Sequence, residues 1–185
     1  MRKTITLIVV LISISNCYSQ TAALYFSSGD SKVTKGNYTG AIADYTKAIE
    51  LKPDFADAYY NRGKNKFSLQ DYRGAIADYT KYLEFKKLDA KTYHKGSLKA
   101  YIQVTPADAY YWRGYSKSNL KNYTGAIADY TKAIELKPVH VSNSYLERGR
   151  AKLELGQKDS GCLDLSKAGE LGNGFAYLLI KIHCN

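Results

Sequence analysis

The sequence predicts an all-α solenoid of stacked helical hairpins, and three observations carry this prediction. The string NYTGAIADYTKAIELKP occurs twice, at Asn37–Pro53 and at Asn122–Pro138, and a looser copy begins at Asp71. The first two copies in chain order are 34 residues apart and the last two are 51 apart, which is one period and one and a half periods. Apolar residues within the string recur at the spacing of one helix face. Hairpins of this period bury their apolar faces only by stacking on one another.

The N-terminal segment predicts export. Two basic residues precede an uncharged apolar stretch, 5–14, and small residues follow at Cys17 and Ser19. This order is typical of a secretory signal peptide, so we expect cleavage after Ser19 to remove residues 1–19. The apolar stretch is shorter than the roughly 20 residues of a membrane span, so we expect no transmembrane segment in the mature chain. A lipid anchor on Cys17 and a retained N-terminal helix are the alternatives. The expected location is periplasmic or secreted, with outer-membrane association as a further alternative.

Charge says little about the partner. The chain carries a formal net charge of +10, but its Lys and Arg residues are spread through every repeat without a run of five or more. A nucleic-acid site concentrates basic residues in a patch or stripe. Together with the expected export, this distribution argues against a nucleic-acid partner.

The mature chain is expected to form one domain, 20–185. We predict four hairpins, at about 22–55, 56–89, 107–140 and 141–173. We also predict an inserted helical segment at about 88–106 and a capping helix at about 174–184. The insertion supplies one extra helix, so we expect the stack to bend or bulge there. Two interpretations of the insertion remain open: a tolerated half-duplication without a role, and a functional lip beside a groove.

The residues at these positions resemble the tetratricopeptide repeat family. The third hairpin shows the pattern most fully, with an aromatic residue and a glycine in its first helix and a small residue, an aromatic residue, an alanine and a closing proline after them: Tyr110, Gly114, Ala126, Tyr130, Ala133 and Pro138. The second hairpin departs from the pattern at Tyr82 and Lys87, and the fourth at Gly161 and Leu165. The resemblance implies a right-handed superhelix whose concave groove is lined by the first helices.

The resemblance also implies a set of groove residues. Carried over residue by residue, the candidates are Phe26, Asp30, Val33, Tyr60, Asn61, Lys64, Phe67, Tyr111, Trp112, Tyr115, Asn119, Leu146 and Arg150. We expect the aromatic members to act as anchors, because aromatic and arginine side chains dominate binding interfaces. Partial packing is the alternative for each of them. Members that bind chaperone tails use a Lys, Asn and Arg clamp, of which only Asn61 matches here, so that clamp is not expected.

A charged set recurs in three hairpins. An Arg and a Lys four residues apart on the first helix accompany an Asp on the second: Arg62, Lys66 and Asp78; Arg113, Lys117 and Asp129; Arg148, Lys152 and Asp164. An arginine near a helix interface needs a carboxylate partner. We therefore predict internal bridges, with a basic ladder for an anionic ligand as the alternative.

Two cysteines remain after cleavage. Cys162 lies about ten residues before the turn at 172–174, and Cys184 about ten after it. An antiparallel hairpin places such positions side by side, so we predict a disulfide that pins the capping helix, with two free thiols as the alternative.

The sequence contains no set of residues with the spacing of a known catalytic or metal site. The histidines are far apart, no metal-ligand spacing occurs, and no nucleophile or phosphate-binding motif is present. We expect no catalysis, no cofactor and no metal. The prediction is a scaffold that binds a peptide or protein in its groove; the alternative is an assembly module of a bacterial cell-envelope complex that docks through its edges.

Overall fold

The computed structural model describes residues 2–89, 105–136 and 141–184, and every regular element within them is a helix. The helices are α1 (Arg2–Thr34), α2 (Tyr38–Leu51), α3 (Ala56–Ser68), α4 (Tyr72–Asp89), α5 (Pro106–Asn119), α6 (Tyr123–Glu135), α7 (Val141–Glu154), α8 (Lys158–Glu170) and α9 (Gly174–His183).

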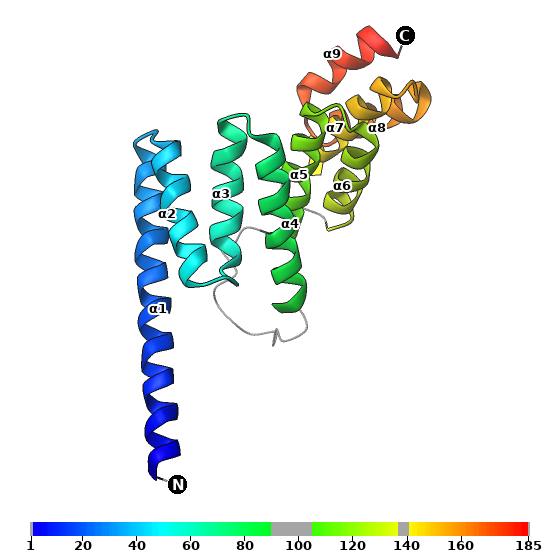
Figure 1. The fold of residues 1–185 in the computed structure, drawn as a ribbon. Coiled ribbons are helices and arrows are strands. Elements are labelled where there is room, and N and C mark those ends of the chain that lie inside the picture. Colours follow the sequence, from blue (N-terminus) through cyan, green and yellow to red (C-terminus); the bar gives the residue numbers. More distant parts are fainter. Residues whose placement is uncertain (1, 90–104, 137–140, 185) are drawn as a thin grey trace.

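The helices form four stacked hairpins, as Figure 1 shows. α1 packs on α2, α3 on α4, α5 on α6 and α7 on α8, and each second helix also packs on the first helix of the next hairpin. α9 packs on α8 at the C-terminal end of the stack. Because each hairpin contacts mainly its neighbours, the core is a row of interfaces and not one central cluster.

The repeated string begins its helices with a side-chain cap. The Asn37 Oδ1 atom accepts a hydrogen bond from the Gly40 backbone N at 2.9 Å, and Asn122 caps α6 through Gly125 in the same way at 3.0 Å. A Cβ added to Gly40 would lie 2.6 Å from the Asn37 side chain. The Asn-x-x-Gly spacing is therefore explained by helix capping.

One repeated position of the second helices fills the interior of each hairpin. Tyr45, Tyr79, Tyr130 and Leu165 are at most 1% exposed. Their side chains lie against the first-helix glycine, and a Cβ added to Gly114 would be 3.0 Å from the Tyr130 ring. Glycine is needed there because interiors of this density leave no room for another methyl group.

The recurring charged set forms internal bridges. Arg62 donates two hydrogen bonds to Asp78, at 2.9 and 2.7 Å, and Lys66 Nζ lies 2.9 Å from the same carboxylate. The same arrangement recurs in the next two hairpins, with Arg113, Lys117 and Asp129 and with Arg148, Lys152 and Asp164. The prediction of internal bridges is confirmed.

A third bond of each arginine joins neighbouring hairpins. Arg62 Nη1 donates to Thr46 Oγ1 of the preceding hairpin at 3.1 Å, and the fourth hairpin repeats this bond. Arg113 Nη1 donates to Thr80 Oγ1 at the same distance, although 33 residues separate this pair and only 16 separate Arg62 from Thr46. The arginine therefore holds both its own hairpin and the one before it.

The insertion does not alter the packing of the hairpins that flank it. We expected a bend or bulge at 88–106, but α5 packs directly on α4. The bond between Arg113 and Thr80 also has the length found at a junction without an insertion. The packing of α5 on α4 is therefore specified by their side chains and not by the length of the connection, and the expected bulge falls on the insertion itself. Residues 90–104, which hold most of the predicted insertion, lie outside the described residues.

The predicted disulfide is present. Cys162 of α8 is bonded to Cys184, which follows α9, with 5.8 Å between the Cα atoms. The inward side of α9 buries Ala176 against a cluster with Leu146, Leu165 and Ala168. The bond and this cluster together fix α9 on the last hairpin.

The backbone of α1 runs without a break through the predicted signal peptide and past Ser19. In the described part of the chain, no helix combines the length and the apolar character that crossing a membrane requires.

Candidate functional site

We call the surface formed by the first helices, α1, α3, α5 and α7, the inner face. Two hollows open on it. The N-terminal pocket, of about 340 Å³, lies between α1 and α3, with α2 behind it. The C-terminal pocket, of about 150 Å³, lies between α5 and α7, beside the start of α6. Aromatic rings occupy the junction of α3 and α5 between them.

The N-terminal pocket brings together four predicted residues, Asp30, Val33, Asn61 and Lys64. The Asp30 Oδ1 atom accepts a hydrogen bond from the Tyr45 hydroxyl at 2.7 Å and another from Asn61 Nδ2 at 3.0 Å. Burial and the bond to Asp30 raise the pKa of Tyr45. Lys64 is exposed and has no ion-pair partner among the described residues. In this pocket the Asp30 carboxylate is hydrogen-bonded within the protein, and the Lys64 ammonium is available to a ligand.

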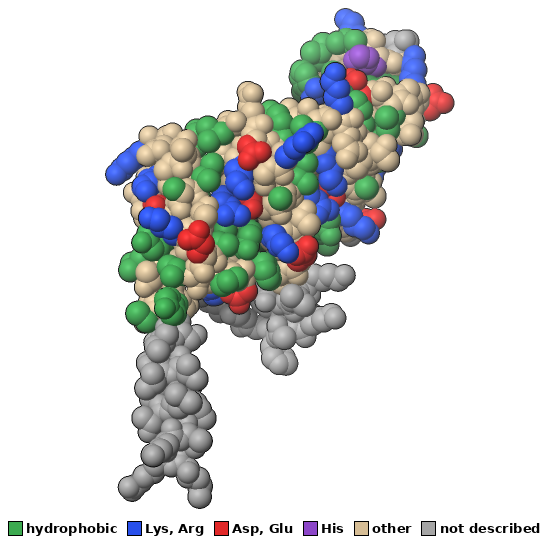
Figure 2. Space-filling model, in the orientation of Figure 1, with side chains coloured by type: hydrophobic (Ala, Val, Ile, Leu, Met, Phe, Trp, Pro, Cys, Tyr) green, Lys and Arg blue, Asp and Glu red, His purple; other side chains and the backbone are tan. Residues whose placement is uncertain are grey.

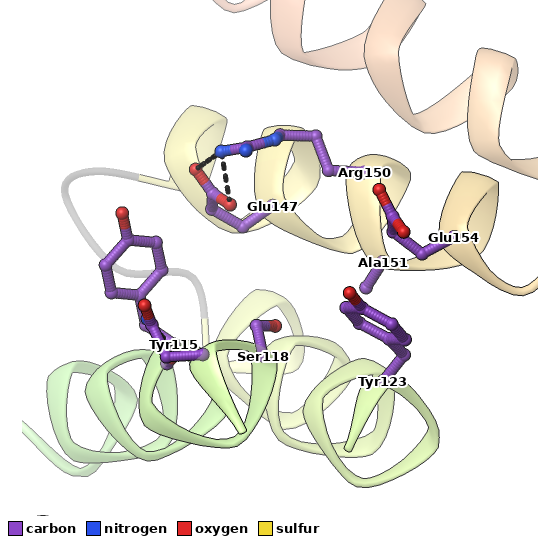
Figure 3. A pocket seen from close by; sticks show the side chains of 8 residues that line it. Tyr115, Ser118, Tyr123, Glu147, Arg150, Ala151 and Glu154 are labelled. Carbon is purple, nitrogen blue, oxygen red and sulfur yellow. Dashed lines mark hydrogen bonds and ion pairs between the residues drawn. The ribbon is translucent and has the colours of Figure 1, made fainter. Parts of the chain in front are cut away.

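In the C-terminal pocket the acid and the cation pair with each other, as Figure 3 shows. Tyr115 projects from α5 and Tyr123 from α6 on one wall, and Glu147, Arg150 and Glu154 stand on α7 on the other. Arg150 Nη1 donates to both oxygens of Glu147, at 3.2 and 3.1 Å. Burial raises the pKa of Glu147, and Arg150 opposes that rise without cancelling it.

Four predicted aromatic residues form a continuous ridge between the pockets; we call Phe67, Tyr111, Trp112 and Tyr115 the aromatic ridge. The Phe67 ring lies 5.3 Å from Trp112 and 5.5 Å from Tyr115, centroid to centroid. Tyr111 stacks on Tyr115 at 6.1 Å with 9° between the planes. All four are half-buried. Such rings offer apolar area that is already held in place, because their neighbours fix their rotamers.

Two groove candidates lie in the core. Tyr60 is 5% exposed, and its ring packs on Tyr79 and Tyr82 at 5.5 and 5.4 Å. For Tyr60 the packing alternative therefore holds, because Tyr82 stands where the resemblance places alanine and supplies a second ring for it. Leu146 is 7% exposed and belongs to the cluster under α9. Phe26 is half-buried and contacts the rings of Tyr45 and Phe55.

The remaining candidates lie at the C-terminal pocket. Asn119 is exposed there and donates from Nδ2 to the Tyr115 backbone O at 2.8 Å. Sequence reasoning missed Glu147 and Glu154, yet a signal existed. In the repeat register these two positions correspond to Trp112 and Asn119, both of which were predicted. Comparing the fourth hairpin with the third would have found them.

The charges on the face of the molecule that Figure 2 shows are mixed. Figure 2 shows Lys and Arg side chains interleaved with Asp and Glu along the stack, without a large field of one sign. Within the described ranges, no group of three or more His, Cys, Asp or Glu side chains is placed to hold a metal ion. The features of the inner face are therefore the aromatic ridge, the two pockets and the charged side chains that line them.

Comparison with known families places repeats along the chain. Three family models match: one described as TPR repeat at residues 29–65, and two described as tetratricopeptide repeat at 56–87 and 107–139. No curated protein matches the sequence.

Solved structures share the fold at low identity. MamA, residues 41 to the end, from Desulfovibrio magneticus RS-1 is 18% identical with a TM-score of 0.69, covering 88% of this chain and 87% of that one. The first TPR domain of Spaghetti (RPAP3), bound to the HSP90 peptide SRMEEVD, is 23% identical with a TM-score of 0.61, covering 75% and 95%. YrrB, described as a TPR protein with an unusual peptide-binding site, is 19% identical with a TM-score of 0.63, covering 85% and 76%.

Proposed function

The chain belongs to the tetratricopeptide repeat family, and from that premise we propose that it is a non-catalytic scaffold that binds an extended segment of a partner protein along its inner face. The observation that carries the proposal is the aromatic ridge of Phe67, Tyr111, Trp112 and Tyr115, flanked by one pocket on each side. Two structural neighbours whose descriptions name a bound peptide or a peptide-binding site support the class of partner.

The ridge suits an extended ligand for energetic reasons. Rings held by one another lose little conformational freedom on binding, so more of the contact energy remains as affinity. Aromatic side chains are also the commonest hot spots of interfaces. Lys64 at one end and Glu147 with Arg150 at the other add polar contacts that fix the direction of a bound segment.

The compartment is part of the proposal. We infer export by the N-terminal segment, with cleavage after Ser19, and the disulfide between Cys162 and Cys184 supports an oxidising compartment. Lipidation of Cys17 is the alternative form of the mature N-terminus. Intact mass of the protein purified from its native host distinguishes the two.

A second candidate function is docking through an edge, as expected of an assembly module. One observation favours it: Leu69, Leu120 and Leu155 occupy equivalent positions in successive hairpin turns and are 47%, 41% and 41% exposed. Three leucines at the repeat spacing on one edge offer a row of apolar contacts.

Affinity capture from the native extract separates the two functions. The wild-type chain is compared with a Trp112→Ala/Tyr115→Ala variant and with a Leu69→Ser/Leu120→Ser/Leu155→Ser variant, all checked for helicity and melting. We expect the ridge variant to lose the partners that the edge variant keeps. Partners kept by the ridge variant and lost by the edge variant would overturn the groove proposal and favour the assembly module.

A further inference from the structure

The C-terminal pocket carries an unusual electrostatic arrangement for a basic protein. Its walls hold two carboxylates, Glu147 and Glu154, against one guanidinium, Arg150. Tyr115 and Tyr123 stand on the opposite wall of the hollow (Figure 3). The pocket is therefore an acidic hollow with aromatic sides on a chain of net charge +10.

We propose that this pocket binds an arginine or lysine side chain of the partner segment, with the charged group against Glu147, where Arg150 now lies, and the alkyl stem against the tyrosine rings of the opposite wall. Glu154, two helix turns further along α7, adds negative charge to the same hollow. The inference rests on the proposed function and names the chemistry that the partner presents at this end of the inner face. Tyrosine faces and carboxylates together are the partners that a cationic side chain prefers.

Glu147 and Arg150 differ in burial, and this difference supports the proposal. The Glu147 side chain is 11% exposed, whereas that of Arg150 is 49% exposed. Exposed arginines give up such pairs at little cost, but a nearly buried carboxylate needs a cation. Arg150 thus stands where a partner's guanidinium would bind, and it can swing toward solvent when one arrives.

Asp30 in the N-terminal pocket is a comparison for Glu147, because it is a carboxylate that we do not expect to bind a cation. Asp30 accepts hydrogen bonds from the Tyr45 hydroxyl and from Asn61, so an incoming cation would compete with two fixed donors. Among the described residues, the Glu147 carboxylate has one hydrogen-bond donor, Arg150, whose charge does not fully offset the burial of the carboxylate. The two pockets therefore select different side chains.

A peptide-display selection tests the inference. The probe is a library of random linear peptides, selected on the full chain and counter-selected on Trp112→Ala, so that recovered peptides need the aromatic ridge. We expect these peptides to carry Arg or Lys at one fixed position. Replacing that residue by citrulline or norleucine should weaken binding to the wild type by about tenfold or more, as charge-assisted bonds are worth this much.

Variants of the pocket complete a double-mutant cycle. Glu147→Gln should weaken the basic peptide by a similar factor and should remove most of the further loss caused by citrulline. Glu135→Gln is the matched control, since Glu135 is an exposed carboxylate of α6 that pairs with Lys132 outside the pocket. Arg150→Ala should tighten the basic peptide by about two- to fivefold, because it removes the internal competitor. Lys64→Ala, at the equivalent position of the second hairpin, should not tighten it.

The outcomes distinguish this inference from the proposed function. Ridge-dependent peptides without a fixed basic residue, or with binding unaffected by Glu147→Gln, would overturn the inference and leave the scaffold function standing. Ridge-dependent peptides with a fixed acidic residue, weakened by Arg150→Ala, would assign the pocket to an anion and also overturn it. Failure to recover any peptide that depends on Trp112 would overturn both.

Discussion

Tyr45, Tyr79 and Tyr130 occupy the same position in successive hairpins, but their hydroxyls have different surroundings. The Tyr45 hydroxyl donates to Asp30 at 2.7 Å, and that of Tyr130 lies 3.3 Å from Ser118 Oγ. The Tyr79 hydroxyl is buried and has no hydrogen-bond partner in the part of the chain that the structure describes. In the repeat register, Phe67 stands where the third hairpin has Ser118, so the second hairpin gives up a hydroxyl partner and gains a ring of the aromatic ridge.

This difference predicts unequal effects of the same substitution. Tyr79→Phe should leave the free energy of unfolding unchanged or raise it, because it removes a buried polar group that has no partner. Tyr45→Phe should lower it by about 1 kcal/mol, since Asp30 loses a donor. Urea unfolding followed by circular dichroism measures both. A larger loss for Tyr79→Phe than for Tyr45→Phe would contradict this account of the second hairpin.

Glu147 predicts a pH dependence at the same scale. Its pKa in the folded chain is raised above the ordinary value of 4.5 by burial, against the charge of Arg150, while burial raises the pKa of the facing Tyr111 and keeps it neutral. A carboxyl whose folded pKa is raised opposes folding above that pKa, and the opposition disappears below the unfolded pKa.

Glu147→Gln should therefore be more stable than the wild type at pH 7, and the difference should shrink as the pH falls below the raised folded pKa and disappear below the unfolded value of 4.5. Thermal unfolding of both proteins between pH 7 and pH 4 measures this. A wild type that is more stable at pH 7 would show that the pair with Arg150 more than compensates for burial. A carboxylate retained against stability is consistent with a role in binding.

At the scale of the helices, the fourth hairpin is packed differently from the others. Gly161 stands where the first three hairpins have alanine, and it meets Gly149 of the facing helix. A Cβ added to either glycine would lie 3.0 Å from the backbone O of the other. The two helix backbones approach closely here because neither position has a side chain.

Restoring the alanine of the other repeats should therefore be unfavourable. We expect Gly161→Ala to lower the free energy of unfolding by about 1–3 kcal/mol, as overpacking does. Gly174→Ala is the control, because a Cβ there would meet nothing within 4 Å. Denaturant unfolding of both variants checks the contrast, and a stabilised Gly161→Ala would mean that α7 and α8 can separate without cost.

The capping helix gives a further prediction. The outward side chains of α9, including Phe175, Leu178 and Ile182, are more than half exposed, so burial on one side and the disulfide hold it in place. Cys162→Ala/Cys184→Ala should cost about 3 kcal/mol, the loop-closure value for a separation of 22 residues. Amide exchange should show α9 losing protection first. Unchanged protection of α9 would mean that its packing alone suffices.

Much of this element-level structure could be predicted from the sequence. Identical copies of AIADYTK require identical helices, and an Asp that recurs with each Arg indicates an internal bridge. The burial of Tyr60 could not be predicted, since it depends on Tyr82 reaching it from another helix, while Tyr111 at the equivalent position stays half-buried. The undisturbed packing across the insertion depends on the contact of Arg113 with Thr80, which the spacing of repeats does not reveal.

At the scale of the whole molecule, the ends of the stack explain a departure from the repeat. Each arginine of the charged set bonds a threonine of the preceding hairpin, and among the described helices no hairpin packs in front of the first one. Ser28 stands at the arginine position there and donates to Asp44 at 2.6 Å, with Lys32 also at 2.6 Å from that carboxylate. The first hairpin thus keeps the internal bridge to Asp44 but lacks the arginine that, in the later hairpins, bonds the preceding hairpin.

The inner face combines residues that no single repeat contains. Phe67 comes from α3, Trp112 and Tyr115 from α5, and the acids of the C-terminal pocket from α7. Residues that are similar in every copy support the hairpins, and residues that differ between copies line the inner face. We therefore expect the identity of the partner to depend on the variable positions, as described for the two pockets.

The most direct test of the central claim uses the chain's single tryptophan, Trp112, as a reporter on the aromatic ridge. The captured partner, or a selected peptide free of tryptophan, is titrated into the full chain while Trp112 emission and its quenching by iodide are recorded. We predict a shift of the emission to shorter wavelength and protection from quenching, both saturating with the binding isotherm. Saturated binding with unchanged emission and unchanged quenching would place the partner elsewhere and contradict the claim that the inner face is the binding site.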